Sequence, residues 1–453
     1  MRFKVVNQPQ AAAILGLPSA DEFGFTGPLA RCCRCAQLNT VLADESSSEA
    51  EDNPLQYNGS PVRLTLRNDA RPANIPARKV PLAFHDEVRS QLKSMLDDNI
   101  IERVATPTAW CSPMLLVPKK GGKFRLCMDP LYLNRFLLRE VYPLPSLDQL
   151  TARLSGAKFF SAIDLKWGFW QLPLDDESSW LCTFSTPFGR FRFKRLPFGV
   201  SPAPEIFHRV VHESIEDLDG VQSYIDDILV SGRTQEEHDA RLAALMERLK
   251  ERGFTINVEK SVFCRRSVKY LGHRISSGRI EVDPDRAAAI RDLPAPQDVA
   301  GLRRMLGMVN YMQMFVPNLA NMTGPMRALL KKNVAWHWSP DCETAFTAVK
   351  RVLLASPALA LFNERMEVTV AADASSFGLG GVLLQEGRPV VYTSRSLLPA
   401  ERRYSQIEKE LLGIVYSLER LEFYTRGRQV VVQTDHKPLL GLVDKQIDEL
   451  SPR

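Results

Sequence analysis

The sequence predicts an α+β chain of about three domains, and three observations lead to this prediction. The chain has 453 residues, of which 45% are hydrophobic, enough to form real cores. An apolar, β-branched run at 223–230 predicts a buried hairpin. Apolar residues recur at helical spacing in 236–253 and 401–424, which predicts two long amphipathic helices.

The N-terminal third begins with a segment of weak pattern. Residues 1–75 have the composition of a leader or linker, because 46–53 is polar and acidic. A helix is expected from about Phe84, where Val88, Leu92 and Met95 recur at helical spacing. Residues 100–145 alternate short apolar runs with Pro and Gly, which predicts short strands and turns.

Helical patterns dominate the middle of the chain. Residues 204–215 have helical periodicity, and the helix at 236–253 carries Leu242, Leu245 and Leu249 on one face. Gly253 provides a stop signal for that helix. The stretch 282–330 is also helical, with prolines between its segments.

The C-terminal segment predicts a β-β-β-α-β order. Strands are expected at 367–372, 378–385, 388–394 and 429–434, with the long helix of 401–424 before the last strand. Five apolar side chains of that helix are predicted to face inward: Leu411, Ile414, Val415, Leu418 and Leu421.

Acidic residues interrupt two of the apolar strands. Asp226 and Asp227 lie within the hairpin run, and Asp164 ends an earlier strand-like run that begins at Phe159. Buried carboxylates are costly unless they are paired or bound to a metal. The alternative for an isolated Asp-Asp pair is a solvent-exposed turn. The apolar flanks favour a site for a hard cation such as Mg²⁺.

Several motif blocks occur in a fixed order around these residues. They are Ala-Trp-Cys-Ser-Pro at 109–113, Phe-Arg-Leu-Cys-Met-Asp at 124–129, Tyr-Pro-Leu-Pro at 142–145, Phe-Ser-Thr-Pro-Phe-Gly at 184–189, Leu-Pro-Phe-Gly-Val-Ser-Pro-Ala-Pro at 196–204, Tyr-Ile-Asp-Asp at 224–227 and Tyr-Leu-Gly-His at 270–273. From about Pro81 onward, the chain resembles the Pol polyproteins of gypsy-type long-terminal-repeat retrotransposons. The matching region comprises reverse transcriptase and the N-terminal part of ribonuclease H.

This resemblance implies a right-hand polymerase followed by a truncated ribonuclease H-like α/β domain. It implies fingers and palm at 76–273, a thumb- or connection-like helical region at 274–350 and the ribonuclease H-like part at 351–453. Residues 1–75 are then a leader with a possible remnant of a protease end. The implied activity is RNA-directed DNA polymerisation on an RNA or DNA template-primer, with deoxynucleoside triphosphates and Mg²⁺ or Mn²⁺.

The resemblance also assigns roles to single residues. Asp164, Asp226 and Asp227 match the metal-binding catalytic triad of the polymerase. Arg125 matches a triphosphate contact, Phe169 the residue under the incoming sugar, Leu196 a position near the nucleotide, and Gly272 the primer grip. A ring at Phe169 would collide with a 2′-hydroxyl, which implies selection of deoxynucleotides.

Three further carboxylates match a ribonuclease H site. Asp373, Glu410 and Asp435 correspond to three of its four metal-binding catalytic residues. The fourth is expected beyond Arg453, and Asp444, Asp448 and Glu449 come too early to replace it. We therefore expect weak or absent nuclease activity.

Two departures from the family pattern favour a second hypothesis. Leu131 stands where a basic residue is usual, and Trp167 where a small or acidic residue is usual. The alternative to an active polymerase is therefore a decayed or co-opted element product that binds nucleic acid without catalysis.

Bulk properties set limits on partners and location. The formal charge of +5 and the pI near 8.7 permit binding to a polyanion. Cys32, Cys33 and Cys35 lack a second group of ligands at zinc spacing, so a zinc site is not expected there. No apolar run approaches the ~18 residues of a membrane span. We expect an intracellular protein, in the cytoplasm or in element particles; the sequence predicts no oligomeric state.

Overall fold

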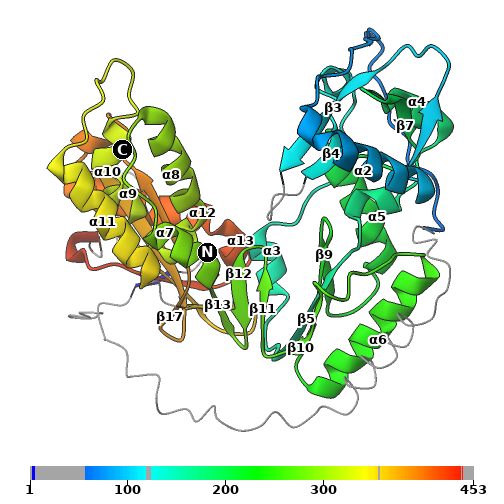
Figure 1. The fold of residues 1–453 in the computed structure, drawn as a ribbon. Helices are drawn as coiled ribbons and strands as arrows, with labels where there is room; N and C mark the ends of the chain where they lie inside the picture. The colour runs from blue at the N-terminus through cyan, green and yellow to red at the C-terminus, as the bar shows by residue number, and fades with distance from the viewer. Residues whose placement is uncertain (1–2, 6–56, 119–123, 356–357, 440, 442–453) are drawn as a thin grey trace. The chain divides into compact units, whose positions relative to one another are not determined.

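The computed structural model describes residues 3–5, 57–118, 124–355, 358–439 and 441. Its packing divides the chain into two compact units (Figure 1). Among the described residues, unit 2 comprises 57–150 and 157–268, and unit 1 comprises 3–5, 151–156 and 269 onward. Each unit is described by itself.

One sheet of unit 2 has five strands in the order β2-β7-β6-β3-β4. The strands are β2 (Ile101–Val104), β3 (Ser112–Pro118), β4 (Phe124–Met128), β6 (Thr183–Thr186) and β7 (Gly189–Phe193). Helix α2 (His85–Asp97) buries Val88, Leu92 and Met95, as its spacing predicts. These side chains join the same core as Phe191 and Phe193 of β7.

The second sheet of unit 2 carries the predicted hairpin. Its order is β10-β5-β9-β8, with β5 (Phe159–Asp164), β8 (Val221–Tyr224), β9 (Asp227–Gly232) and β10 (Val262–Arg265). Helices α5 (Ala203–Ile215) and α6 (Gln235–Glu251) lie within two residues of the predicted boundaries. Figure 1 shows α6 running beside this sheet. Its face of Leu242, Leu245 and Leu249 is buried, as predicted.

Short helices complete the connections of unit 2 and its boundary. They are η1 (Leu82–Phe84), η2 (Leu133–Arg135), α3 (Leu147–Ala152), η3 (Gly168–Gln171) and α4 (Asp176–Leu181). The segment 57–75, predicted as part of a leader, packs into the core through Val62 and Leu64. The N–H of Leu64 donates to Ser178 Oγ at 2.7 Å. The sequence gives no periodic signal here, because the segment contributes isolated bridges and no named strand.

Unit 1 begins with a small sheet and a group of helices. The sheet order is β11 (Ser267–Tyr270), β12 (His273–Ser276), β13 (Arg279–Val282) and β14 (Leu359–Ala360). The predicted helical stretch contains α7 (Pro284–Arg291), α8 (Val299–Tyr311), η4 (Gln313–Phe315), α9 (Leu319–Met322) and α10 (Gly324–Ala328). Helix α11 (Pro340–Leu354) follows and buries Phe346, Val349 and Leu353.

The last sheet of unit 1 has the order β1-β18-β15-β16-β17. It combines β1 (Phe3–Val5), β15 (Val368–Ala374), β16 (Gly378–Gln385), β17 (Arg388–Ser396) and β18 (Val430–Gln433). Strand β18 lies parallel to both β1 and β15, whereas β15, β16 and β17 are antiparallel. Strand β1 therefore gives part of the predicted leader a place in this sheet.

The predicted helix of 401–424 is interrupted. The structure has η5 (Glu401–Arg403), α12 (Gln406–Arg420) and α13 (Glu422–Thr425), with η6 (Lys437–Leu439) after β18. A capping box formed by Ser405 and Glu408 starts α12, since each side chain accepts a backbone N–H of the other's residue.

The predicted inward face of α12 is partly wrong. Leu421 is buried, but Leu411 and Val415 are each 44% exposed. The buried face is formed by Lys409, Glu410, Gly413 and Ser417. A Cβ atom on Gly381 of β16 would overlap the Ser417 hydroxyl, so the helix lies too close to the sheet for large side chains. Small side chains therefore determine which face of α12 packs against the sheet. Hydrophobic periodicity does not take side-chain size into account, so it does not predict this face.

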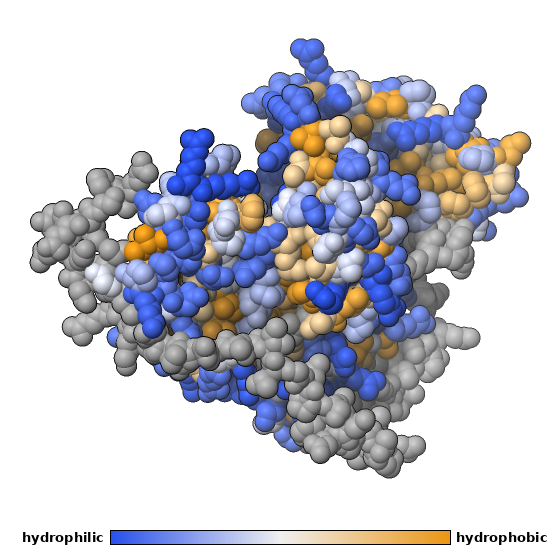
Figure 2. All heavy atoms as spheres, turned by 90° about the vertical axis from the view of Figure 1, so that its left-hand side faces the viewer, coloured by the Kyte–Doolittle hydropathy of each residue, from blue (hydrophilic) through white to orange (hydrophobic). Residues whose placement is uncertain are grey.

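Within the described ranges, no helix is both long and apolar enough to span a lipid bilayer. The face of the molecule in Figure 2 is a mixture of hydrophilic and hydrophobic side chains.

Candidate active sites

The palm-like sheet of unit 2 brings two predicted metal ligands side by side. Asp164 is the last residue of β5 and Asp227 the first of β9, and the two are directly paired in the antiparallel register. Directly opposed residues of neighbouring strands project from the same face of a sheet. Asp226 lies in the turn between β8 and β9 and is exposed. The sequence thus folds all three carboxylates to one end of this sheet.

The turn that carries Asp226 has an unusual backbone. Ile225 has φ +57°, in the left-handed region that β-branched residues rarely adopt. Its N–H donates to Nδ1 of His208, on α5, at 3.2 Å. The strained residue is therefore held from outside the hairpin.

The carboxylates perturb one another electrostatically. Burial raises the pKa of Asp227 to about 6, and the nearby charges of Asp226 and Asp164 add to the rise. Burial also raises the pKa of Asp164, while Lys260 lowers it and Asp226 raises it again. Concentrated negative charge of this kind is what a divalent cation relieves.

A segment after α6 surrounds Asp164 and was missed by sequence reasoning. The N–H of Asn257 donates to the Asp164 carbonyl oxygen at 2.7 Å, and the N–H of Asp164 donates to Ser261 Oγ at 3.0 Å. Lys260 Nζ lies 3.8 Å from Asp164 Oδ1. Nothing in the local pattern of 257–261 signals this role, because the contacts span about a hundred residues of chain.

The predicted nucleotide residues form a layered group beside the hairpin. The Arg125 guanidinium, on β4, lies 4.7 Å from the centre of the Phe198 ring. The Phe169 ring lies 5.0 Å from the same ring and 5.3 Å from that of Phe207. Phe198 belongs to a motif block but was not predicted as a site residue. Phe198 contacts both Arg125, to which the resemblance assigns a phosphate contact, and Phe169, to which it assigns the position under the sugar.

Leu196, which the resemblance places near the nucleotide, follows β7 by three residues. Its side chain is fully buried in the core of unit 2, and its N–H donates to the Leu172 carbonyl oxygen at 2.9 Å. Apolar burial explains this placement, since the position follows β7 and faces the same core.

The two departures from the family pattern have different surroundings. Leu131 is 66% exposed. Trp167 has φ +61° and packs against the core of unit 2, with Lys166 Nζ 4.2 Å from the centre of a Trp167 ring. Trp167 begins the turn after β5 and provides an apolar support there.

Gly272 lies in unit 1, between β11 and β12. Leu271 and Gly272 have φ of +48° and +69°, a pair of left-handed residues that makes a tight turn. Glycine is favoured at this φ, and a Cβ atom on Gly272 would also require the Arg286 guanidinium to move. The hydroxyl of Tyr311 donates to the Leu271 carbonyl oxygen at 2.7 Å and fixes the same turn.

The predicted nuclease residues converge in unit 1. Oxygen atoms of Asp373, Glu410 and Asp435 lie within 4.8 Å of one another. Glu410 is only 5% exposed, and its Oε2 accepts the N–H of Ala374 at 3.1 Å. Gln406 donates to Glu410 Oε1 at 2.5 Å and was not predicted. Burial, followed by the charges of Asp373 and Asp435, raises the pKa of Glu410, although Gln406 opposes the rise.

The polymerase carboxylates are less tightly grouped. Among the residues that the structure describes, they do not all come within the 4.8 Å that the nuclease carboxylates meet. Cys32, Cys33 and Cys35 lie outside the described residues.

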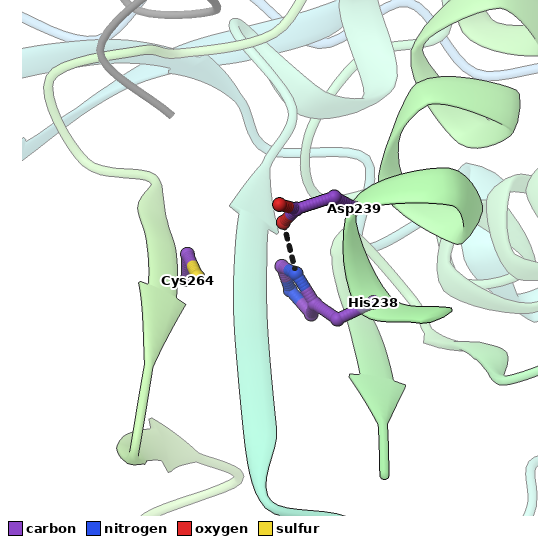
Figure 3. A group of neighbouring side chains, drawn as sticks. All are labelled: His238, Asp239 and Cys264. Atoms are coloured by element: carbon purple, nitrogen blue, oxygen red, sulfur yellow. Dashed lines mark hydrogen bonds and ion pairs between the residues drawn. The ribbon is translucent and has the colours of Figure 1, made fainter. Parts of the chain in front are cut away.

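His238, Asp239 and Cys264 form another close group, shown in Figure 3. Asp239 accepts from His238 Nδ1 at 3.0 Å, which leaves Nε2 to accept from the Ser161 hydroxyl at 2.8 Å. Ser161 Oγ in turn accepts the N–H of Cys264 at 2.9 Å. Both ring nitrogens of this buried histidine thus have protein partners. The network ties α6 and β10 to β5, three residues from Asp164.

Two family models match parts of this chain. Residues 117–275 match the family described as reverse transcriptase (RNA-dependent DNA polymerase). Residues 338–432 match the RNase H-like domain found in reverse transcriptase.

Similar proteins include Pol polyproteins of mobile elements. The retrovirus-related Pol polyprotein from transposon 412 of Drosophila melanogaster is 31% identical over 420 residues, which cover 90% of this chain and 34% of that protein. The one from transposon opus, also of Drosophila melanogaster, is 34% identical over 404 residues, covering 83% of this chain and 40% of that protein. The chain thus spans about a third of the length of the curated relatives it matches.

Solved structures establish the fold. The foamy viral protease-reverse transcriptase in complex with double-stranded DNA matches with a TM-score of 0.78 and 21% identity, over 94% of this chain and 90% of that one. A dRH form of that protein, also with double-stranded DNA, matches with a TM-score of 0.81 and 20% identity, over 94% and 76%. The predicted fold class is confirmed. The chain contains a reverse transcriptase domain followed by a ribonuclease H-like domain and is related to the Pol polyproteins of gypsy-type retrotransposons.

Proposed function

We propose that this chain is an RNA-directed DNA polymerase, which adds deoxynucleotides to a primer 3′ end on an RNA or DNA template. The observation that carries the proposal is the pairing of Asp164 with Asp227, with Asp226 in the adjoining turn. Three carboxylates at one end of a sheet suit the transfer of a nucleotidyl group from a triphosphate to a primer hydroxyl, with release of pyrophosphate.

The carboxylates fit Mg²⁺ or Mn²⁺. They offer hard oxygen donors, and Asp227 has a pKa raised to about 6, so its ionised form is stabilised when a cation binds. Asp164 and Asp226 would hold the ions most directly, with Asp227 completing the negative charge. A pair of such ions, when bound, lowers the pKa of the primer hydroxyl and stabilises the departing pyrophosphate. Divalent metal dependence is general in the family; the choice of ion is part of the proposal.

The nucleotide would be positioned by the group around Phe198. Arg125 carries a fork of donors that can bind phosphate oxygens bidentately. Phe169 presents a ring beside it, where a 2′-hydroxyl would collide. The pair would thus bind a deoxynucleoside triphosphate and reject its ribonucleotide counterpart.

The partners we propose are an RNA or DNA template-primer and deoxynucleoside triphosphates. The left-handed turn at Leu271 and Gly272 would contact the primer, as the resemblance to the primer grip implies for Gly272. We propose an intracellular location, in the cytoplasm or in element particles.

Primer extension on an RNA template tests the proposal. Wild type is compared with the Asp226→Asn, Asp227→Asn variant, which keeps the shape of both side chains but removes their charge. We expect extension by wild type in Mg²⁺ or Mn²⁺ and a loss of at least about a thousandfold in the variant, as for removal of key transition-state stabilisers. If neither protein extends a primer while both still bind the hybrid, the non-catalytic alternative replaces this proposal.

A second candidate activity is hydrolysis of the RNA strand of a hybrid. It is favoured by the convergence of Asp373, Glu410 and Asp435 within 4.8 Å. Degradation of a labelled RNA–DNA hybrid by the Asp226→Asn, Asp227→Asn variant would measure it without interference from synthesis. The same assay with Asp373→Asn added should abolish any cleavage that this site causes.

A further inference from the structure

His208 is buried beneath the hairpin that carries Asp226. It lies on α5, is only 1% exposed, and accepts the N–H of Ile225 at Nδ1. Because Nδ1 accepts, the ring is neutral and carries its proton on Nε2. Burial and, to a smaller extent, the nearby His212 lower the pKa of His208 to about 4, which agrees with a neutral ring.

The other side of the ring is unusual. The buried Nε2 has no hydrogen-bond partner among the described residues. A buried donor without a partner is destabilising, so the ring is poorly suited to serve only as core filling. An apolar side chain of similar size would fill the space without that cost. The contact that distinguishes histidine here is the one to Ile225.

Aromatic neighbours fix the orientation of the ring. The rings of Tyr142, His212 and Tyr224 lie 5.7, 5.8 and 6.4 Å from it. Tyr142 is held in turn by a 3.0 Å hydrogen bond between its hydroxyl and His212 Nδ1. The ring that carries the Nδ1 acceptor is therefore packed among aromatic side chains from α5, from β8 and from the segment before α3.

The recipient of this hydrogen bond is the strained residue of the turn. Ile225 has φ +57°, and without an external partner its N–H would favour relaxation to an ordinary conformation. Relaxation would redirect the next residue, Asp226, away from Asp164 and Asp227. A hydrogen bond between α5 and the turn opposes this change.

We propose that His208 is a positioning residue for the metal site, whose Nδ1 holds the Ile225 N–H so that the turn presents Asp226 to a divalent cation. The inference rests on the proposed function, because it takes Asp226 as a metal ligand. It assigns to α5 a role in catalysis that is separate from its packing in the core.

A matched pair of substitutions at His208 distinguishes loss of the hydrogen-bond acceptor from a change in the shape of the side chain. Asparagine and leucine have the same branched outline, but only asparagine places an acceptor, Oδ1, near the position of Nδ1. The test uses the full chain with Asp373→Asn and Glu410→Gln, which silence the nuclease cluster. Into this parent we introduce His208→Leu, His208→Asn or, as the control for lost binding, Asp226→Asn.

Two measurements are made on each protein. Electron paramagnetic resonance of free Mn²⁺ gives the metal affinity, and hydrogen–deuterium exchange of a peptide spanning Ile225 gives the protection of its N–H. We expect His208→Leu to weaken Mn²⁺ binding and to speed exchange by about fivefold each, the effect of one lost hydrogen bond. We expect His208→Asn to recover most of both.

The outcomes distinguish this inference from the function on which it rests. Equal Mn²⁺ affinities for the leucine and asparagine variants would overturn the role of His208, whatever the exchange rates. If Asp226→Asn binds Mn²⁺ as tightly as its parent, the proposed polymerase metal site is itself wrong, and the role of His208 falls with it. Thermal unfolding of both variants shows whether either has lost its fold.

Discussion

At the residue scale, the fold brings Asp164, Asp226 and Asp227 close together, and this makes the ionised form of Asp227 unfavourable when no metal is bound. The pKa of Asp227 is raised from 3.8 to about 6, so the folded protein binds this proton more tightly than the unfolded chain does. The stabilisation that follows is complete at low pH and is lost as the pH rises toward and past 6. Near neutral pH, folding must partly bury the Asp227 carboxylate, which is already ionised, beside two other carboxylates.

The substitution Asp227→Asn removes that penalty and should stabilise the metal-free protein. At pH 7.5 in EDTA we expect the free energy of unfolding to rise by roughly 1–3 kcal/mol, the scale of a two-unit pKa shift reduced by partial exposure. The gain should shrink as the pH falls to 4.5, where wild type is protonated. Thermal unfolding at both pH values measures it, and a gain that does not change with pH would show that charge is not its cause.

Phe169 should control sugar selection through its ring. The change Phe169→Ala opens space beside Phe198, and we expect incorporation of ribonucleotides, relative to deoxynucleotides, to rise by at least about tenfold. Competition between GTP and dGTP during primer extension measures the ratio. Phe207→Leu is the control, because it alters the buried partner of Phe169 and leaves the ring in place. No change for Phe169→Ala would remove this residue from the nucleotide site.

At the element scale, the contrast between the two faces of α12 shows how a helix can be placed by small residues. Gly413 and Ser417 face the sheet, where Ser417 touches Gly381 of β16, while Leu411 and Val415 remain half-exposed. The hydrophobic pattern identified the helix correctly and misjudged its orientation. Close approach puts Glu410 within reach of Asp373, so the same small residues that mislead the pattern also build the nuclease cluster.

Substitutions on the two faces of α12 should have opposite consequences. Ser417→Leu places a large side chain against Gly381, and we expect a loss of about 1–3 kcal/mol, as for an overpacked core. Leu411→Gln should change stability by less than about 0.5 kcal/mol, the usual range for a surface position. Chemical denaturation of both variants compares them. A larger loss for Leu411→Gln would mean that the apolar face of α12 is the packed one.

Elements with a continuous apolar face were predictable from sequence, and contacts made across long stretches of chain were not. The helices α2, α5 and α6 and the hairpin of β8 and β9 appear where their patterns place them. The carboxylates were identified because strand ends and motif order mark them. Lys260, Phe198 and His208 were missed, since their roles depend on what the fold brings near them. The full burial of Leu196 was not evident from the sequence either, because a motif position does not reveal burial.

At the scale of the whole molecule, the surface charge is mild for a protein that we propose binds nucleic acid. The net charge is only +5, so phosphate binding must come from local groups of Lys and Arg rather than from a uniformly basic surface. Such contacts release counterions from the nucleic acid when they form. Affinity should therefore depend steeply on salt despite the small net charge.

The salt dependence of hybrid binding tests this expectation. Fluorescence anisotropy of a labelled RNA–DNA hybrid between 50 and 200 mM KCl should show a linear fall of log affinity with log salt, by about a thousandfold or more if six or more phosphates are contacted. Single-stranded DNA of equal length is the comparison. A slope near zero would indicate binding that does not depend on phosphates.

The pairing of Asp164 with Asp227 has a consequence for assembly of the protein. A slip of one residue between β5 and β9 would turn Asp164 and Asp227 to opposite faces, and the cation site that we propose for them would be lost. The affinity for a cation would therefore depend on whether β5 and β9 are paired in the correct register, because a shift of one residue is enough to lose it. During refolding, Mg²⁺ would stabilise chains in which β5 and β9 are correctly paired. Chains with a shifted register would gain no such stabilisation and could rearrange. The metal that we propose for polymerisation would then also favour the correct pairing of β5 with β9 during folding.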